Sequence, residues 1–172
     1  MTDGARVRLR PMTDVEFGTW RASAIESYAA DVALASGVPL DLATERSRAE
    51  FEELLPDGLS THGSWVLTIV DGADGSDVGT LWIGPHPRRP GAAYVFDIEV
   101  DSAQRGRGLG RASMLAAEHL VGEAGITEIG LNVFGFNERA RRLYDSLGYR
   151  VVATQMTKSV AAGESRRDGA AR

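Results

Sequence analysis

The chain has 172 residues, of which 43% are hydrophobic and 25% are charged, and these proportions are typical of one globular domain with a substantial core. Its net charge of −5 predicts no general attraction to nucleic acid or anionic membranes, and the absence of cysteine excludes disulfides and a cysteine nucleophile. No apolar segment has membrane-spanning length, and the first residues lack the apolar core of a secretion signal. We therefore expect a cytoplasmic protein with no membrane or nucleic-acid partner.

The N-terminal half of the chain predicts one strand, two helices and a β-hairpin. The predicted elements are a strand at Val7–Arg10, a helix from Thr13 to about Ala35, a helix from Asp41 to about Leu55, and strands at Trp65–Val70 and Val78–Ile83. Thr13 and Glu16 have the spacing of a capping box, so the first helix should begin there. The Gly- and Asp-rich residues 71–75 predict the turn of the hairpin.

The C-terminal half predicts strands that alternate with helices. The predicted elements are a strand at 93–100, a helix at 109–124, a strand at 127–133, a helix at 138–147 and a strand at 149–157. Residues 158–172 lose the apolar periodicity and are rich in Ala, Gly, Ser and Arg, so we expect a frayed tail. The pattern as a whole predicts a single mixed α/β domain at 1–157.

The segment 104–110, with the sequence QRGRGLG, lies directly between an apolar strand and a helix. Its three glycines have no Cβ, which lets the backbone turn tightly and lets successive N–H groups converge on an anion. The helix N-terminus adds the positive end of its dipole, and Arg105, Arg107 and Arg111 add fixed positive charge. This order of elements indicates a site for the pyrophosphate of a nucleotide-like cofactor.

Two common phosphate-binding motifs do not fit this turn. The dinucleotide fingerprint requires GxGxxG, but Ser113 occupies the place of the third glycine, and the acidic residue nearest the expected spacing, Glu128, begins the next strand instead of ending it. A Walker loop is excluded because the chain has no Gly-Lys-Ser/Thr sequence. The pattern Arg105-x-x-Gly108-x-Gly110 instead resembles the acyl-CoA pyrophosphate loop of the GCN5-related N-acetyltransferase (GNAT) superfamily.

A second segment, residues 131–149, strengthens this resemblance. Its sequence, LNVFGFNERARRLYDSLGY, is similar to the family's C-terminal half, in which a strand ends in a loop with Asn and the next helix carries Leu-Tyr and ends at Leu-Gly-Phe/Tyr. Asn137 is a suitable N-cap for this helix, and Gly148 is placed to end it. The two motifs cover about residues 94–157, whereas the first ninety residues match the family only in general layout.

The resemblance implies a mostly antiparallel sheet that is splayed between its fourth and fifth strands, with helices on both faces and acyl-CoA in the splay. The pyrophosphate is expected on the backbone N–H groups of the glycine-rich turn, and the pantetheine arm is expected to pair with the strand edge as an added strand would. Val100 N–H would polarise the thioester carbonyl, and Asn137 would hydrogen-bond the pantetheine arm. The predicted cofactor-binding residues are Ile98, Val100, Arg105, Gly106, Arg107, Gly108, Leu109, Gly110, Arg111 and Asn137.

Tyr144 occupies the family's Leu-Tyr position, and the resemblance implies that it is the acid that protonates the departing thiolate. A phenol with an ordinary pKa of about 10 is protonated at neutral pH and is able to donate that proton. The alternative is that Tyr144 is only a core residue of its helix.

The sequence defines the general base less clearly. Strict two-residue alternation divides the strand at 93–100 into one face with Tyr94, Phe96, Ile98 and Val100 and another with Val95, Asp97 and Glu99. If both carboxylates approach the acceptor pocket, their repulsion and partial burial would raise the pKa of one of them, and Glu99, nearer the splay, is the preferred base. The alternative is that both carboxylates recognise a positively charged substrate. Some related enzymes use a Glu on the fifth strand, where this chain has Asn132, which leaves open a water-mediated base or a neutral acceptor.

We therefore expect an acetyl-CoA-dependent N-acetyltransferase that acts on a primary amine of a small molecule or peptide by direct attack in a ternary complex. The lack of cysteine and of a GxSxG motif argues against an acyl-enzyme, and three scattered histidines predict no metal site. The resemblance also implies that the first two helices line the acceptor pocket, with Tyr28, Glu26 or Asp31 facing it. The alternative function is a catalytically inactive acyl-CoA-binding sensor or interaction module, and a homodimer is compatible with either.

Overall fold

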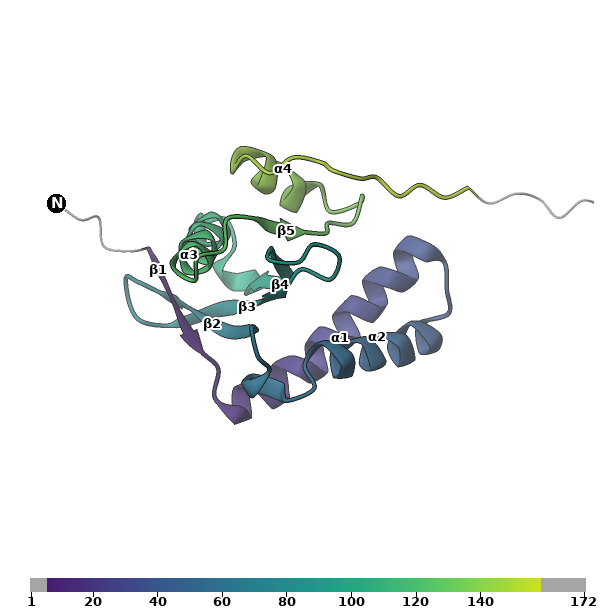
Figure 1. Cartoon of the computed structure of the whole chain (residues 1–172), viewed down its shortest axis with the longest axis horizontal. Coiled ribbons are helices and arrows are strands. Elements are labelled where there is room, and N and C mark those ends of the chain that lie inside the picture. The colour runs from purple at the N-terminus through teal and green to yellow at the C-terminus, as the bar shows by residue number, and fades with distance from the viewer. Residues whose placement is uncertain (1–5, 159–172) are drawn as a thin grey trace, which may run out of the picture.

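The computed structural model describes residues 6–158, in which four α-helices surround a five-stranded sheet (Figure 1). The strands are β1 (Val7–Pro11), β2 (Trp65–Asp71), β3 (Asp77–Pro85), β4 (Ala93–Val100) and β5 (Ile129–Leu131), and the helices are α1 (Asp14–Ser36), α2 (Leu40–Leu54), α3 (Leu109–Glu123) and α4 (Glu138–Ser146). The strands lie side by side in chain order, and all neighbours are antiparallel except β4 and β5. The predicted mixed, mostly antiparallel sheet is therefore confirmed.

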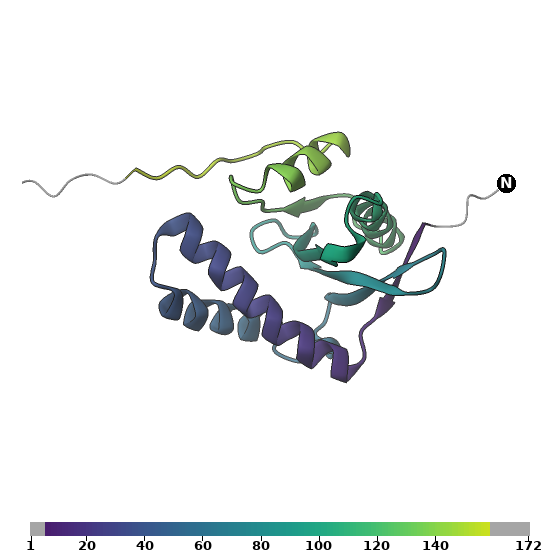
Figure 2. The same ribbon diagram turned by 180° about the vertical axis from the view of Figure 1, so that it is seen from behind.

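Helices cover both faces of the sheet, and each face has its own apolar core (Figures 1 and 2). On one face, α3 and α4 pack on the sheet around Leu81, Met114 and Tyr144. On the other face, α1 and α2 pack around Trp20, Phe51 and Trp82. None of the helices within residues 6–158 is both long enough and apolar enough to span a bilayer.

The start of α1 confirms the predicted capping box. The Glu16 N–H donates to Thr13 Oγ1 at 3.3 Å, and the Thr13 N–H donates to Glu16 Oε2 at 2.7 Å. Arg10 of β1 also donates to the Glu16 carboxylate, at 2.6 Å, and together these bonds lower the pKa of Glu16 to about 2. The same carboxylate thus begins the helix and ties it to the first strand.

A β-bulge interrupts β4, and it changes the faces predicted from strict alternation. Trp82 of β3 pairs with Asp97, but the next residue, Ile83, pairs with Val95, so Phe96 is the extra residue. Val95 and Ile98 consequently pack in the same core beside α3, whereas Phe96 packs in the core beside α1. The prediction that Val95 and Ile98 lie on opposite faces is therefore wrong, because one extra residue inverts the alternation.

The C-terminal part differs from its predicted secondary structure. β5 has only three residues instead of the predicted 127–133, and the strand predicted at 149–157 is not formed. A strand requires a neighbour for its backbone hydrogen bonds, and residues 150–158 run clear of the sheet (Figure 1). Apart from Lys158, the tail predicted at 158–172 lies outside the described residues.

Candidate active site

β4 and β5 pair over only part of their length, and this incomplete pairing opens a wedge in the sheet. The parallel pairing joins residues 93–95 to residues 129–131, while β4 continues to Val100. Beyond Val95, the edge of β4 that faces β5 therefore has no strand partner within residues 6–158. Such an edge presents unpaired N–H and C=O groups and is able to accept an extended, amide-bearing ligand as an additional strand.

The glycine-rich turn follows this free edge and has the backbone geometry of an anion site. Gly106 and Gly108 have φ values of 84° and 78°, which favour glycine, and Gly108 is the N-cap residue of α3. The first intrahelical bond of α3 runs from the Ala112 N–H to the Gly108 carbonyl, so the N–H groups of residues 109–111 have no helical acceptor. Within the described chain, residues 106–111 thus present consecutive free N–H groups at the positive end of a helix.

Side chains from distant segments hold the turn in place. Arg107 donates to the buried carboxylate of Asp71 at 2.6 Å, and the Arg107 carbonyl accepts a bond from Arg6. The Arg105 side chain folds back onto β4, donating to the Val100 carbonyl at 3.0 Å and lying 3.4 Å from Glu99. The side chains of Arg105 and Arg107 are therefore engaged with the protein, which leaves the backbone N–H groups as the available donors of the turn.

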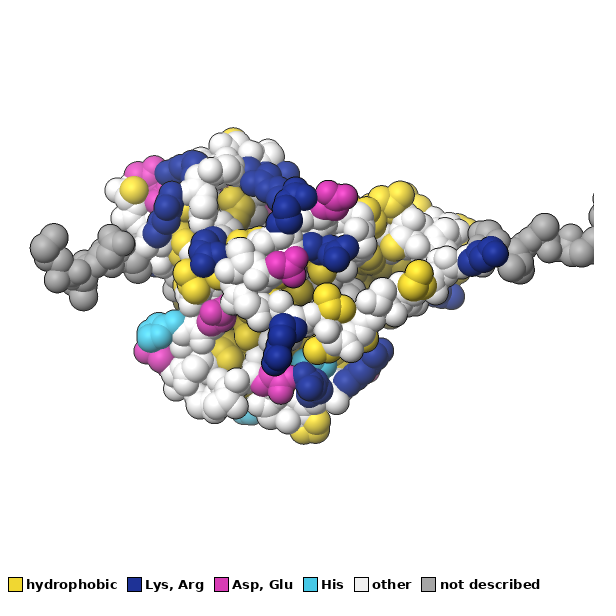
Figure 3. Space-filling view, turned by 90° about the horizontal axis from the view of Figure 1, so that it is seen from above, with side chains coloured by type: hydrophobic (Ala, Val, Ile, Leu, Met, Phe, Trp, Pro, Cys, Tyr) yellow, Lys and Arg dark blue, Asp and Glu magenta, His cyan; other side chains and the backbone are white. Residues whose placement is uncertain are grey.

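Basic side chains, with acidic ones between them, gather on the face of the molecule that Figure 3 shows. Arg111 lies in the first turn of α3 and donates to Ser146 Oγ of α4 at 2.8 Å, and α4 itself carries Arg139, Arg141 and Arg142. Arg142 is paired with Glu138 at 3.2 Å. The chain is acidic overall, so this face is an exception to its general charge and favours a polyanionic ligand.

Tyr144 lies in the core between α4 and the sheet, with only 8% of its surface exposed. Burial raises the pKa of its phenol above 10, and the nearby charge of Asp97 raises the pKa further. Tyr144 is therefore protonated at neutral pH, as a proton donor must be. The structure also gives it a packing role, because its ring lies 5.7 Å from that of Tyr149.

Asp97 and Glu99 lie in different environments although only one residue separates them. The Asp97 carboxylate accepts a 3.0 Å hydrogen bond from Trp20 Nε1, and burial raises its pKa. Glu99 has 59% of its side chain exposed and is paired with Arg105. Of the two carboxylates, Asp97 thus has the environment that tunes an acid–base group, which sequence alternation had not distinguished.

An aromatic and acidic surface connects α1, α2 and the segment after β5. The ring of Tyr28 lies 6.4 Å from that of Phe134, which stacks on Phe136 at 5.4 Å. Burial and the nearby Glu50 raise the pKa of Tyr28 to about 12. Tyr28 of α1 thus lies close to Phe134 in the segment after β5. The sequence had not indicated Glu50 and Phe134 as neighbours of Tyr28.

Two other predicted positions have clear local roles. The side-chain Oδ1 of Asn137 accepts a bond from the Ala140 N–H at 3.1 Å, which confirms Asn137 as the N-cap of α4. Ser113, at the third-glycine position of a dinucleotide fingerprint, is fully buried and donates to the Leu109 carbonyl at 2.8 Å. The Ser113 side chain occupies the place where the fingerprint needs a glycine for close packing of the helix on the strand. This disfavours a dinucleotide as the cofactor.

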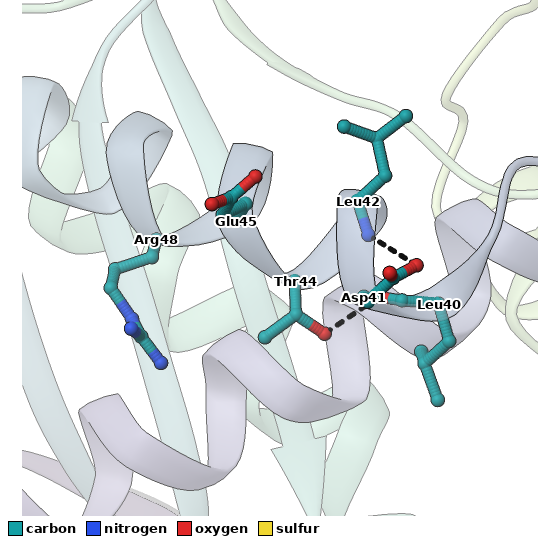
Figure 4. Close-up of a pocket in the computed structure, with 6 residues that line it drawn as sticks. All are labelled: Leu40, Asp41, Leu42, Thr44, Glu45 and Arg48. Carbon is teal, nitrogen blue, oxygen red and sulfur yellow. Dashed lines mark hydrogen bonds between the residues drawn. The ribbon is translucent and has the colours of Figure 1, made fainter.

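An open pocket at the start of α2 lies on the opposite side of the molecule from α3 (Figures 1 and 4). The Thr44 hydroxyl donates to the Leu40 carbonyl at 2.8 Å, and the Leu42 N–H donates to Asp41 Oδ1 at 2.9 Å. These bonds are local to the helix, and neither Tyr144 nor the turn lines this pocket. We therefore place the candidate site at the wedge between β4 and β5 instead.

Comparisons with known proteins identify the family to which this fold belongs. The model of the acetyltransferase (GNAT) family matches residues 34–149. This match covers more than half of the chain, and the chain belongs to that family.

The relatives of this chain include the uncharacterized N-acetyltransferase YycN of Bacillus subtilis, which is 30% identical over 158 residues, covering 90% of this chain and 99% of YycN. The crystal structure of that putative acetyltransferase aligns with a TM-score of 0.83 at 27% identity, over 91% of this chain and 99% of YycN. A mycothiol acetyltransferase of Beutenbergia cavernae is 29% identical over 87% of this chain but only 46% of its own length. AAC(6')-Iy, solved with a CoA-containing bisubstrate analogue, shares the fold alone, with a TM-score of 0.57 at 16% identity over 91% of this chain and 99% of AAC(6')-Iy.

Proposed function

We propose that this chain is an acetyl-CoA-dependent N-acetyltransferase that acetylates a primary amine by direct attack in a ternary complex. The observation that carries the proposal is the free edge of β4, which is followed, after a short 3-10 turn, by a glycine-rich turn of unpaired N–H groups. Family membership supports acetyl transfer in general, and the geometry of the wedge supports an acyl-CoA donor.

Acetyl-CoA fits this region in two parts. The pyrophosphate accepts hydrogen bonds from the N–H groups of residues 106–111. The arginines of α4 add electrostatic attraction for the phosphates. The pantetheine amides pair with the edge of β4 at Ile98 and at the Val100 N–H, because Arg105 already bonds the Val100 carbonyl. Asn137 keeps its side chain on the α4 cap, so we assign it at most a secondary contact with the arm.

The reaction needs one proton acceptor and one proton donor. The amine nitrogen attacks the thioester carbonyl carbon, and the carbonyl oxygen is stabilised by a backbone N–H at Val100. The amine loses a proton to the base as the carbon–sulfur bond breaks, and the thiolate of CoA takes a proton from Tyr144. Tyr144 suits this role because its raised pKa keeps the phenol protonated until sulfur develops negative charge.

For the base we propose Asp97, with Glu99 as the alternative. Burial raises the pKa of Asp97. The charge of Asp97 also raises the pKa of Tyr144, so the two groups interact electrostatically. Glu99 is more exposed and is paired with Arg105, an arrangement that suits orientation of the turn better than proton transfer.

The acceptor is proposed to be a cationic amine with an apolar portion, on a small molecule or a peptide. Tyr28 and Phe134 provide aromatic surface, and Glu50 provides a carboxylate beside it. Aromatic faces and carboxylates attract organic ammonium groups, and Asp97 then removes the proton of the bound amine.

The test measures thiol release from acetyl-CoA with a panel of cationic amines and N-terminal peptides, alongside calorimetric binding of CoA. Tyr144→Phe should lower kcat about a hundredfold while CoA still binds, because only the proton donor is removed. The proposed activity is contradicted if CoA binds but no acceptor is turned over, a result that favours a binding module. Absence of CoA binding would contradict the site itself.

A further inference from the structure

The two oxygens of the Asp97 carboxylate have different surroundings. Oδ2 accepts the 3.0 Å hydrogen bond from Trp20 Nε1, whereas Oδ1 accepts no hydrogen bond from residues 6–158. Oδ1 is not sealed in the core, because the buried side-chain atoms without a partner in the described chain belong to Arg21, Trp82 and Tyr149. A carboxylate has two equivalent oxygens in water, so a fixed bond to one of them leaves the other for a proton.

The donor of this bond is held firmly by its own packing. Trp20 lies on α1 with only 6% of its surface exposed. Its ring lies 5.8 Å from that of Phe17, 6.0 Å from that of Phe51 and 5.7 Å from that of Trp82. A side chain with two torsions that is packed on several sides has little freedom to turn its N–H away. The aromatic core beside α1 therefore fixes the direction in which the Asp97 carboxylate is held.

The bond also acts on the protonation of Asp97. Burial raises the pKa of Asp97, the Trp20 bond opposes this by stabilising the carboxylate, and the charge of Glu99 raises the pKa further. The other groups around it are Arg105, which pairs with Glu99, and Tyr144 of α4, whose pKa the charge of Asp97 raises. The β3 residue that pairs with Asp97 is a tryptophan and carries no charge. Without the Trp20 bond, Asp97 would therefore stay protonated, and unable to accept a proton, up to a higher pH.

We propose that Trp20 is the positioning residue of the base: its indole N–H holds Asp97 Oδ2, and the free Oδ1 takes the proton of the acceptor amine. This inference rests on the proposed function, in which Asp97 is the base. In the step, the N–H bond of the amine breaks, its electron pair stays on nitrogen, and the proton forms an O–H bond with Oδ1. The indole keeps its own proton throughout, because a tryptophan N–H is a donor only.

The test makes the same substitution at two tryptophans of one core. Trp20→Phe removes the N–H that holds Asp97, whereas Trp82→Phe removes an N–H that is buried without a partner in the described residues. Trp20→Phe should lower kcat about tenfold or more and move the acid limb of kcat/KM to higher pH, with the KM for the amine and the affinity for CoA unchanged. Trp82→Phe is the matched control and should keep the kcat and the acid limb of the wild type.

A second measurement needs neither a tryptophan variant nor turnover. The chain has three tryptophans, and the indole N–H resonance of Trp20 in an NMR spectrum should shift with pH as Asp97 titrates. Asp97→Asn keeps an oxygen for the bond but has no carboxyl group, so this shift should be lost in that variant. The resonance of Trp82, whose N–H has no partner in the described chain, serves as the internal reference.

The outcomes separate this inference from the proposed function. A Trp20 resonance that does not respond to Asp97 overturns the inference, as does a Trp20→Phe enzyme with the kcat and pH profile of the wild type. Equal changes in Trp82→Phe would assign the effect to core packing and overturn it as well. If CoA binds and the Trp20 resonance follows Asp97 but no acceptor is turned over, the bond stands, whereas the proposed function and the catalytic role of the bond are contradicted.

Discussion

At the scale of single residues, the site depends on how burial and charge distinguish similar side chains. Asp97 and Glu99 are both carboxylates on one strand, yet the first is partly buried and held by Trp20, whereas the second is exposed beside Arg105. Arg107 similarly differs from Arg105 because its partner is the buried carboxylate of Asp71, which fixes the turn, whereas Arg105 pairs with the exposed Glu99. Residue type alone therefore does not assign these roles.

Asp97→Asn should lower kcat about a hundredfold, because an amide does not accept the amine's proton, while its oxygen still accepts the Trp20 bond. Burial raises the pKa of Asp97 above 3.8 in the folded protein, so folding stability falls as the pH rises from the unfolded pKa through the folded pKa. Asp97→Asn has no carboxyl group to ionise, so it lacks this pH-dependent loss of folding stability. It should therefore be at least as stable as the wild type at neutral pH. Initial rates and denaturant unfolding check both statements.

The pH profile provides an independent check on the same assignment. If Asp97 is the base, the acid limb of kcat/KM lies above the ordinary pKa of an aspartate and disappears in Asp97→Asn. Glu99→Gln is the matched control and should keep that limb. A profile that changes in Glu99→Gln but not in Asp97→Asn would instead support Glu99.

Asp71→Asn should weaken CoA binding about fivefold or more, because Arg107 loses its charged acceptor and the turn is held less firmly. Asp77→Asn is a suitable control, since Asp77 forms its ion pair at the surface with Arg10 and not with an arginine of the turn. Calorimetry with CoA measures the difference. Equal effects from both substitutions would show that the turn does not depend on Asp71.

At the scale of elements, the position of β4 depends on how closely it approaches β3. A Cβ added to Gly79 would lie 2.0 Å from the Glu99 carbonyl oxygen, which is backbone and has little freedom to move. Gly79→Ala should therefore destabilise the fold by about 2 kcal/mol or more and shift the end of β4 that borders the wedge. Thermal unfolding and CoA calorimetry measure the two effects.

Gly18→Ala is the matched control for this substitution. Gly18 lies inside α1, and an added Cβ has nothing within 4 Å. Alanine is the better helix former, so this variant should be more stable by about 0.5–1 kcal/mol with unchanged CoA binding. A loss of stability in Gly18→Ala comparable to that in Gly79→Ala would contradict the role assigned to the close strand contact.

Most elements were predictable from local sequence, and the exceptions have a common cause. The capping box, the turn glycines and the Asn137 cap depend on neighbours within a few residues, and each is confirmed. The bulge at Phe96 and the Arg107–Asp71 pair depend on contacts across the sheet, which no local pattern encodes. The predicted strand at 149–157 has strand composition but lacks a neighbour in its own described chain, and composition does not supply a partner.

At the scale of the whole molecule, charge is distributed unevenly. The chain carries a net charge of −5, but α4 and the start of α3 present arginines beside the turn (Figure 3). CoA binding should therefore weaken several-fold between about 0.05 and 0.5 M salt, because screening shortens the reach of these charges. A titration series at increasing salt measures this. Salt-independent affinity would mean that the backbone N–H groups alone hold the phosphates.

The incomplete pairing of β4 with β5 has a consequence for the lifetime of the protein. A sheet that leaves an inner strand half unpaired lacks ladder hydrogen bonds that a bound partner would restore, so the empty protein should open first at this wedge. A ligand that binds only the folded state reduces the unfolded population in proportion to its concentration over its dissociation constant. The cellular supply of acyl-CoA would then govern how much of this protein survives proteolysis, as well as how fast it works.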